Sequence, residues 1–174
     1  MTITLRIATD VDLAAINARY AGIGFVPSLP GELIVIATRD GITAGQGRIV
    51  PIDTRSGELG GIHVLPQFEG RGVARCIVAF LIQQANLPVL YCLPFGELEG
   101  FYGSMGFVPV KEPGCVPEKV AQKHQWCNTN YEKPVLLLER VAASIPLAAA
   151  AVAAAEVGAT ARGMQHQIAA GNDL

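Results

Sequence analysis

The sequence lacks an excess of positive charge and lacks an apolar run long enough to cross a membrane. Its 13 Lys and Arg residues are outnumbered by 15 Asp and Glu residues, for a formal net charge of −2. This balance disfavours a nucleic-acid partner, because such proteins usually display a strongly basic surface. The longest apolar stretch, within residues 142–155, is shorter than the roughly 18–20 residues of a membrane span. We therefore expect neither nucleic acid nor a membrane as a partner.

The sequence also lacks closely paired cysteines and a recognisable secretory signal. Its four cysteines are widely spaced, so we expect reduced thiols in a cytoplasmic protein. Cys115, His124 and Cys127 are candidates for metal ligands, but they lack the close Cys pair that is typical of zinc sites. We expect no bound metal.

What is present fits one folded domain followed by a segment of different composition. The 174 residues are 51% hydrophobic, which is enough to build a core. After Val141 the sequence becomes alanine-rich and is interrupted by Pro146. We predict a domain over residues 1–141 and a tail over residues 142–174 that is helical or partly disordered. The tail is interpreted as a peripheral appendage, with a functional interface as the alternative.

Strands and helices alternate along the predicted domain. Apolar and β-branched runs indicate strands, and apolar residues three or four apart indicate helices. Gly60 and Gly61 interrupt one strand and suggest a β-bulge. The expected strands are Ile3–Ala8, Leu33–Thr38, Ile42–Ile52, Glu58–Val64, Pro88–Leu93, Val108–Val110 and Val135–Val141. Three helices are expected: one that carries Leu13, Ile16 and Tyr20, one over Gly70–Ala85 and one over Glu97–Met105.

The segment from His63 to Arg75 joins a strand to a helix through a loop that contains Gly70 and Gly72. Glycine lets the backbone turn tightly and approach a ligand without an intervening Cβ atom. The first N–H groups of the following helix have no partner within the helix, so they can bind a pyrophosphate. A simple turn is the alternative interpretation of the two glycines alone.

Two motifs resemble those of the GNAT superfamily of N-acyltransferases. The run Val64-x-Pro66-x-Phe68-x-Gly70-x-Gly72-Val73-Ala74 resembles the superfamily's acyl-CoA loop, and Phe101–Phe107 is similar to its Phe-Tyr-x-x-x-Gly-Phe element. The resemblance covers about residues 3–141. It implies an α/β fold with a mixed, mainly antiparallel central sheet, splayed parallel central strands and helices on both faces. The strands that splay would be Glu58–Val64 and Pro88–Leu93.

The resemblance implies acetyl-CoA as co-substrate, with its pantetheine arm between the splayed strands. Arg71 and Arg75 would neutralise phosphates, and their alternative role is that of exposed helix residues. Two positions differ from the usual pattern: Glu69 stands where the family usually has Gln or Arg, and Phe95 lies near the place of a usual Asn. The expected cofactor-binding residues are Ile62, His63, Val64, Glu69, Gly70, Arg71, Gly72, Val73, Ala74, Arg75 and Phe95.

Acyl transfer to an amine needs a base for the ammonium proton, donors for the carbonyl oxygen and an acid for the departing thiolate. The resemblance places Tyr102 beside the sulfur as the general acid, while a core tyrosine with a hydrated hydroxyl is the alternative. The resemblance makes Glu58 our candidate base, because some members of the superfamily carry a catalytic glutamate at this position of the strand. A solvated Glu58 beside a water chain, or His63 as the base, remain alternatives. His63 and Val64 should face opposite sides of the strand.

Together these expectations predict a cytoplasmic N-acetyltransferase that acts on a primary amine of a small molecule by direct attack within a ternary complex. No cysteine stands where a motif marks a nucleophile. A homodimer is possible. A catalytically silent acyl-CoA-binding sensor or interaction module is the alternative. The late polar segment contains His124, Trp126, Asn128 and Tyr131, which we expect either to face the acceptor or to form a loop tethered by a buried Trp126.

Overall fold

A computed structural model of the 174-residue chain describes residues 2–142. The predicted tail lies outside the described residues except for Ala142. Within residues 2–142, no helix combines the length and the apolar character needed to traverse a bilayer.

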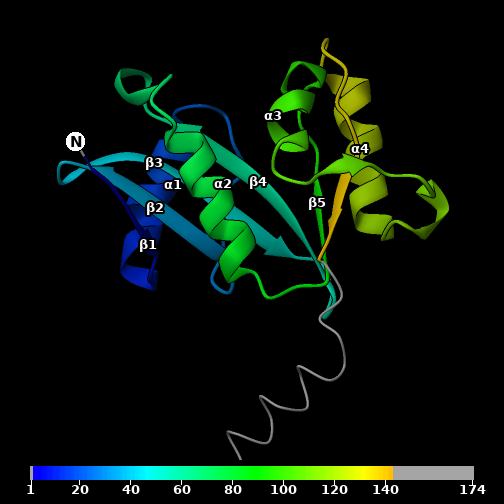
Figure 1. The fold of residues 1–174 in the computed structure, drawn as a ribbon, viewed down its shortest axis with the longest axis horizontal. Coiled ribbons are helices and arrows are strands. Elements are labelled where there is room, and N and C mark those ends of the chain that lie inside the picture. The colour runs from blue at the N-terminus through cyan, green and yellow to red at the C-terminus, as the bar shows by residue number, and fades with distance from the viewer. Residues whose placement is uncertain (1, 143–174) are drawn as a thin grey trace, which may run out of the picture. The chain divides into compact units, whose positions relative to one another are not determined.

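The described residues build one seven-stranded sheet with the order β1-β2-β3-β4-β5-β7-β6 (Figure 1). The central pair, β4 and β5, is parallel, and every other neighbouring pair is antiparallel. This arrangement confirms the mixed, mainly antiparallel sheet that the resemblance implied. The strands are β1 (Ile3–Ile7), β2 (Leu33–Arg39), β3 (Ile42–Pro51), β4 (Ser56–Val64), β5 (Val89–Cys92), β6 (Val108–Pro109) and β7 (Leu138–Val141).

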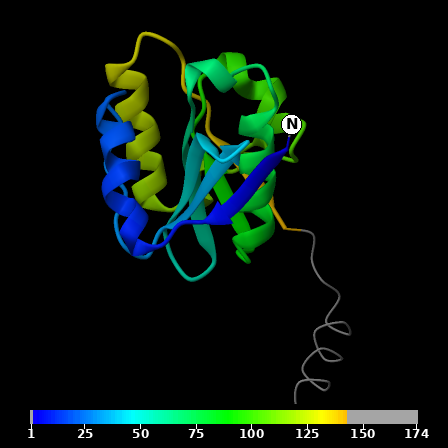
Figure 2. The same ribbon diagram turned by 90° about the vertical axis from the view of Figure 1, so that its left-hand side faces the viewer.

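Helices cover both faces of the sheet, as expected. Figure 2 shows α1 and α4 on one side of the sheet and α2 and α3 on the other. Their bounds are α1 (Leu13–Ala21), α2 (Val73–Gln84), α3 (Glu99–Gly103) and α4 (Glu118–Asn130); single 3-10 turns are η1 (Asp10–Asp12), η2 (Pro66–Phe68), η3 (Gly96–Leu98) and η4 (Pro113–Cys115).

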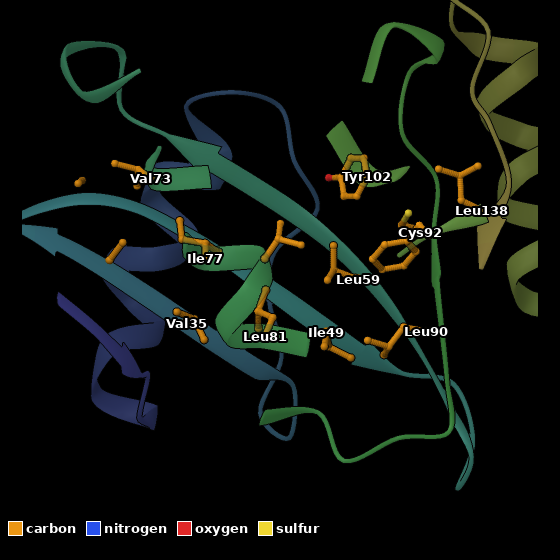
Figure 3. Packing of buried hydrophobic residues seen from close by; sticks show 14 residues of the cluster. Val35, Ile49, Leu59, Val73, Ile77, Leu81, Leu90, Cys92, Tyr102 and Leu138 are labelled. Atoms are coloured by element: carbon orange, nitrogen blue, oxygen red, sulfur yellow. The ribbon is translucent and has the colours of Figure 1, made fainter. Parts of the chain in front are cut away.

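The alternation of side chains along β2 explains the two layers of the core. Val35 and Ala37 point into the main cluster on the α2 side, whereas Ile34 and Ile36 pack with α1 on the other side. On the α2 side, Ile77 and Leu81 are fully buried (Figure 3). Burial of these side chains supplies the main driving force for docking α2 on the sheet.

The predicted bulge at Gly60 and Gly61 is confirmed. Gln46 pairs with His63 but Arg48 pairs with Gly60, so β4 holds one residue more than β3 between these pairs. Gly61 has φ +60°, and a Cβ atom there would lie 2.6 Å from the Tyr20 hydroxyl oxygen. Tyr20 donates a hydrogen bond to the Gly61 carbonyl oxygen at 2.7 Å. A glycine is needed here because a side chain would collide with this contact.

The parallel pair β4 and β5 separates toward its carboxyl ends. Only Ser56–Leu59 of β4 pair with Val89–Cys92 of β5, although β4 continues to Val64. After β5 the chain pairs with the segment that precedes β7 and not with β4. The Leu136 N–H donates to the Pro94 carbonyl, and Phe95 forms a bridge with Val135. Figure 1 shows the two strands diverging from their paired segment. The splayed central strands are therefore present.

One expected element was wrong. The segment between Val110 and Val135 was expected to be a polar loop, but Glu118–Asn130 form α4. Its exposed residues other than Trp126 are polar, and only Val120 and Cys127 are buried, so its apolar period is too weak to indicate a helix. Trp126 is 56% exposed, so it does not tether the segment from a buried position.

Candidate active site

The glycine-bearing loop between β4 and α2 has the open geometry that the sequence predicted. Gly70 and Gly72 have φ of +67° and +80°, a region that other residues seldom adopt. A Cβ atom at either position would meet no atom within 4 Å. Gly72 directly precedes α2, which begins at Val73. The first N–H groups of α2 therefore lie next to an uncrowded backbone, which suits close approach by an anion.

Charged side chains flank this loop in different ways. Arg71 and Glu69 are exposed. Arg75 is not a free helix residue: its Nη1 donates to the Ser104 Oγ at 3.1 Å, and its guanidinium lies 5.5 Å from the centre of the Phe101 ring. These contacts link α2 to the Phe101–Phe107 segment. Arg75, which directly follows the first motif, thereby contacts the second motif through Ser104.

The last residues of β4 present different side chains to the two faces. Ile62 and Val64 pack with the main cluster on the α2 side. His63 pairs across the sheet with Gln46, whose amide contacts Arg19 and the backbone of Ile16 in α1. His63 and Val64 thus face opposite sides, as predicted.

The surroundings of His63 disfavour its charged form. Burial lowers the pKa of His63 below its ordinary value of 6.5, and the positive charge of Arg19 lowers it further. The nearby carboxylate of Glu69 has the opposite effect. The Nδ1 atom of His63 is buried and has no hydrogen-bond partner among the described residues.

Tyr102 is enclosed in the main cluster, with 7% of its surface exposed. Its ring makes edge contacts with Phe101 and Phe107, at centroid distances of 5.0 and 5.8 Å. In Figure 3 its hydroxyl points away from Leu138. Burial raises the pKa of Tyr102 above its ordinary value, and the proximity of Cys92 adds to this effect. The phenol therefore keeps its proton throughout the neutral range.

Glu58 is buried and paired rather than solvated. It is 8% exposed, and the ammonium group of Lys123 in α4 donates a hydrogen bond to its Oε1 atom. That oxygen lies 3.6 Å from the position of a Cβ atom on Gly60, so the carboxylate leans toward the first β4 residue beyond the paired segment. Glu58 thus lies at the point where β4 and β5 begin to diverge.

The expected site residues are therefore divided between the two faces of β4. Tyr102 and the glycine loop lie on the side of α2 and α3, whereas Glu58 contacts α4 on the other side. A group held between the diverging strands would lie between the candidate acid and the candidate base.

Phe95 lies in a surface cluster of aromatic side chains. Its ring makes an edge contact with Tyr131 at 5.6 Å, and Tyr131 makes another with Trp126 at 5.8 Å. Lys133 lies 5.9 Å from the Phe95 ring centre. The side chain of Phe95 thus packs against Tyr131 at the end of α4, and its backbone forms an isolated bridge with Val135.

The late polar residues are largely used to hold α4 to the chain before β7. His124 Nε2 lies 2.8 Å from the Val135 carbonyl oxygen, and the Asn128 side chain exchanges hydrogen bonds of 3.0 Å with the Val135 backbone. These contacts give both residues a structural role.

Sequence reasoning missed Lys123, the partner of Glu58. Pro117 followed by Glu118 is a helix-start signal, and residues 118–130 contain neither Gly nor Pro. These signals would have predicted α4, but nothing in the sequence pairs Lys123 with Glu58.

Two further features of the described chain were not expected from the sequence. A shallow hollow of about 260 Å³ is lined by Tyr91, Lys111, Cys115 and their neighbours, and none of the predicted site residues lines it. Burial raises the pKa of the Cys92 thiol, which makes it a poor nucleophile. Within residues 2–142, His, Cys, Asp and Glu side chains form no group of three that could hold a metal ion.

Comparisons with known proteins agree with this architecture. Residues 30–109 match the family model described as acetyltransferase (GNAT) domain. No curated protein matches the sequence significantly.

Several solved structures share the fold. N-acetylglutamate synthase from Neisseria gonorrhoeae, complexed with coenzyme A and N-acetyl-glutamate, has a TM-score of 0.60 and 18% identity over 83% of this chain and 36% of its own. Rv2747 from Mycobacterium tuberculosis, in complex with CoA, has a TM-score of 0.65 and 18% identity over 80% of this chain and 99% of its own. The ribosomal-protein-S18-alanine N-acetyltransferase from Escherichia coli has a TM-score of 0.58 and 15% identity over 83% and 98%.

The present chain spans about a third of the length of the gonococcal synthase and almost all of the other two proteins. The matched domain contains the diverging strands and both motifs described above. Over residues 30–109 the chain thus matches the GNAT acetyltransferase family model, and its fold is shared with solved N-acetyltransferases.

Proposed function

We propose that this protein transfers an acetyl group from acetyl-CoA to a primary amine of a small molecule, by direct attack within a ternary complex. The observation that carries the proposal is the divergence of β4 from β5 beside the open Gly70–Gly72 loop. CoA-bound structures with the same fold support the choice of co-substrate. The two strand edges offer backbone groups for the pantetheine amides, and the loop offers N–H groups for the pyrophosphate.

Acetyl-CoA supplies an activated thioester, and the residues of this chain supply its surroundings. We assign binding of the arm to the β4 segment Ile62–Val64 and to the backbone of Phe95, which follows the end of β5. The phosphates are assigned to Gly70, Gly72 and the start of α2, with Glu69 shaping the loop through its backbone. Arg71 is free to approach a phosphate, and Arg75 would do so by leaving Ser104.

The proton transfers are assigned to Glu58 and Tyr102. An alkylammonium group has a pKa of about 10 and no lone pair, so it must lose a proton before it attacks. Glu58 is the candidate acceptor of that proton, and a water chain that ends at Glu58 serves the same purpose. Tyr102 remains protonated at neutral pH, so it can donate a proton to the departing thiolate.

The partners and location follow the same proposal. A small amine is the expected acceptor, whereas the name of the ribosomal-protein-S18-alanine N-acetyltransferase indicates that another protein of this fold acts on an alanine of a ribosomal protein. A cytoplasmic location and a possible homodimer remain proposals.

The test is a thiol-release assay with acetyl-CoA and a panel of amines that includes amino acids, polyamines and short peptides. Thiol release that depends on an added amine supports acetyl transfer, and the amine that is accepted identifies the class of substrate. Calorimetric titration with CoA is run in parallel. CoA binding without release from any acceptor favours the silent binding module, and absence of CoA binding contradicts the proposal.

A further inference from the structure

Lys123 is distinguished from the other lysines of the described chain by its partner. Lys133 also forms an ion pair, but its partner Glu97 is 60% exposed at the side chain. Lys123 instead reaches the buried Glu58, while half of its own side chain remains exposed. Lys119, one helical turn earlier on α4, forms no ion pair within residues 2–142. Among residues 2–142, only Lys123 brings a primary amine to the candidate base.

The Lys123 amine lies where the reacting nitrogen of an acetyl acceptor would have to lie. A general base must lie within hydrogen-bond reach of the proton that it removes. If Glu58 removes the proton, the acceptor nitrogen lies beside Oε1, and this is the atom that Lys123 already contacts. The same oxygen leans over Gly60, where β4 separates from β5. Gly60 has no side chain to stand between the amine and the space between the strands.

We propose that Lys123 is an internal acceptor, so that the protein acetylates its own α4 helix at this residue. The inference rests on the proposed function, because it uses the same co-substrate and the same base. Glu58 takes a proton from the Lys123 ammonium group, and the neutral Nζ atom attacks the thioester carbonyl. An N–C bond forms and the C–S bond breaks. The CoA thiolate takes a proton from Tyr102 or from water, and this donor regains a proton from solvent, which receives the second proton that Nζ loses as the amide forms. Glu58 then releases its proton to solvent.

Acetylation has a structural consequence at this site. The amide product carries no positive charge, so it cannot form the ion pair with Glu58. The buried carboxylate would then lack its cation, and the position beside Oε1 would be open to an external amine. The modified and unmodified proteins should therefore differ in thermal stability, with the modified form melting at a lower temperature.

The experiment measures acetylation of each lysine by peptide mass spectrometry after incubation with acetyl-CoA and no added amine. Lys119 and Lys133 report unassisted chemical acetylation, for an unpaired and a paired lysine respectively. We expect Lys123 to be modified faster than both. Glu58→Gln should slow modification of Lys123 about 10²–10⁴-fold, the usual range for loss of a general base, and leave Lys119 unchanged.

A second measurement uses the unaltered protein and involves no acetyl transfer. Bound CoA should shield Lys123 from labelling by propionic anhydride and leave Lys119 accessible. This footprint keeps the proposal testable if Glu58→Gln does not fold.

Three results would overturn the proposal. The first is amine-dependent thiol release while Lys123 stays unmodified, which leaves the proposed function intact. The second is modification of Lys123 no faster than that of Lys119 and indifferent to Glu58→Gln. The third is a chain that binds no CoA, which overturns the proposed function as well.

Discussion

Tyr102 is the single residue whose surroundings bear most directly on the proposed chemistry. Its phenol is buried and protonated at neutral pH, and Tyr102→Phe removes the acidic proton while keeping the ring contacts with Phe101 and Phe107. We expect single-turnover acetyl transfer to fall about 10²–10⁴-fold with CoA affinity almost unchanged. The matched control is Tyr131→Phe, which alters an exposed tyrosine. A wild-type single-turnover rate in Tyr102→Phe would exclude Tyr102 as the acid.

His63 gives a prediction about stability and pH. Its folded-state pKa is lowered, chiefly by burial and then by Arg19, so the unfolded chain binds this proton more readily. The free energy of unfolding should therefore fall as the pH drops below about 6.5, and level off below the folded-state pKa. His63→Gln removes this contribution, so its melting temperature should fall less between pH 7.5 and 5.5. Equal falls in both proteins would contradict this account of His63.

For single residues, the sequence predicted backbone conformation better than it predicted which distant side chains contact each other. Gly61, Gly70 and Gly72 were predictable because glycine adopts positive φ values far more readily than other residues. The contact between Glu58 and Lys123 was not predictable, because 65 residues separate them and the helix that carries Lys123 went unrecognised. Pairing of distant side chains depends on how elements pack, and no local pattern encodes it.

The strand–loop–helix element around Gly72 carries the phosphate-binding proposal. Gly72→Val introduces a branched side chain at φ +80°, where strain costs about 1–3 kcal/mol, and blocks the open approach to the loop. We expect the dissociation constant for CoA to rise at least about tenfold. Gly41→Val is the matched control, since Gly41 has φ +82° and equally open surroundings in the β2–β3 hairpin. Calorimetry that finds equal CoA affinity in both folded variants would contradict the assignment of the loop.

Local sequence patterns predicted most of the helices and strands, but they did not predict α4. The α2 helix buries Val73, Ile77, Val78 and Leu81 on one face, so its period is plain in the sequence. The α4 helix is held to the sheet partly by polar contacts of Lys123, His124 and Asn128, which leave no apolar stripe to recognise. The divergence of β4 and β5 came from the family resemblance, since parallel pairing and its end are properties of tertiary structure.

The boundary of the domain is a property of the whole molecule. The Ala142 N–H donates to the Pro88 carbonyl at 2.8 Å, so the last contact of the described fold lies one residue beyond β7. A chain ending at Ala142 should keep the melting temperature and the CoA affinity of the full chain, because the sheet and both motifs precede the cut. Size-exclusion chromatography and calorimetry test this. Aggregation or lost CoA binding after truncation would show that residues 143–174 contribute to folding, assembly or the site.

The central claim concerns the whole molecule: CoA lies between the diverging strands, with its phosphates at the loop before α2. Titration of the ¹⁵N-labelled protein with CoA, followed by backbone amide NMR, tests it most directly. We predict that the largest amide shifts occur at Gly60, Gly61, Gly70 and Gly72, while Gly22, Gly41 and Gly114 stay unchanged and serve as internal controls. Shifts confined to the hollow beside Cys115, or no shifts at saturating CoA, would contradict the account.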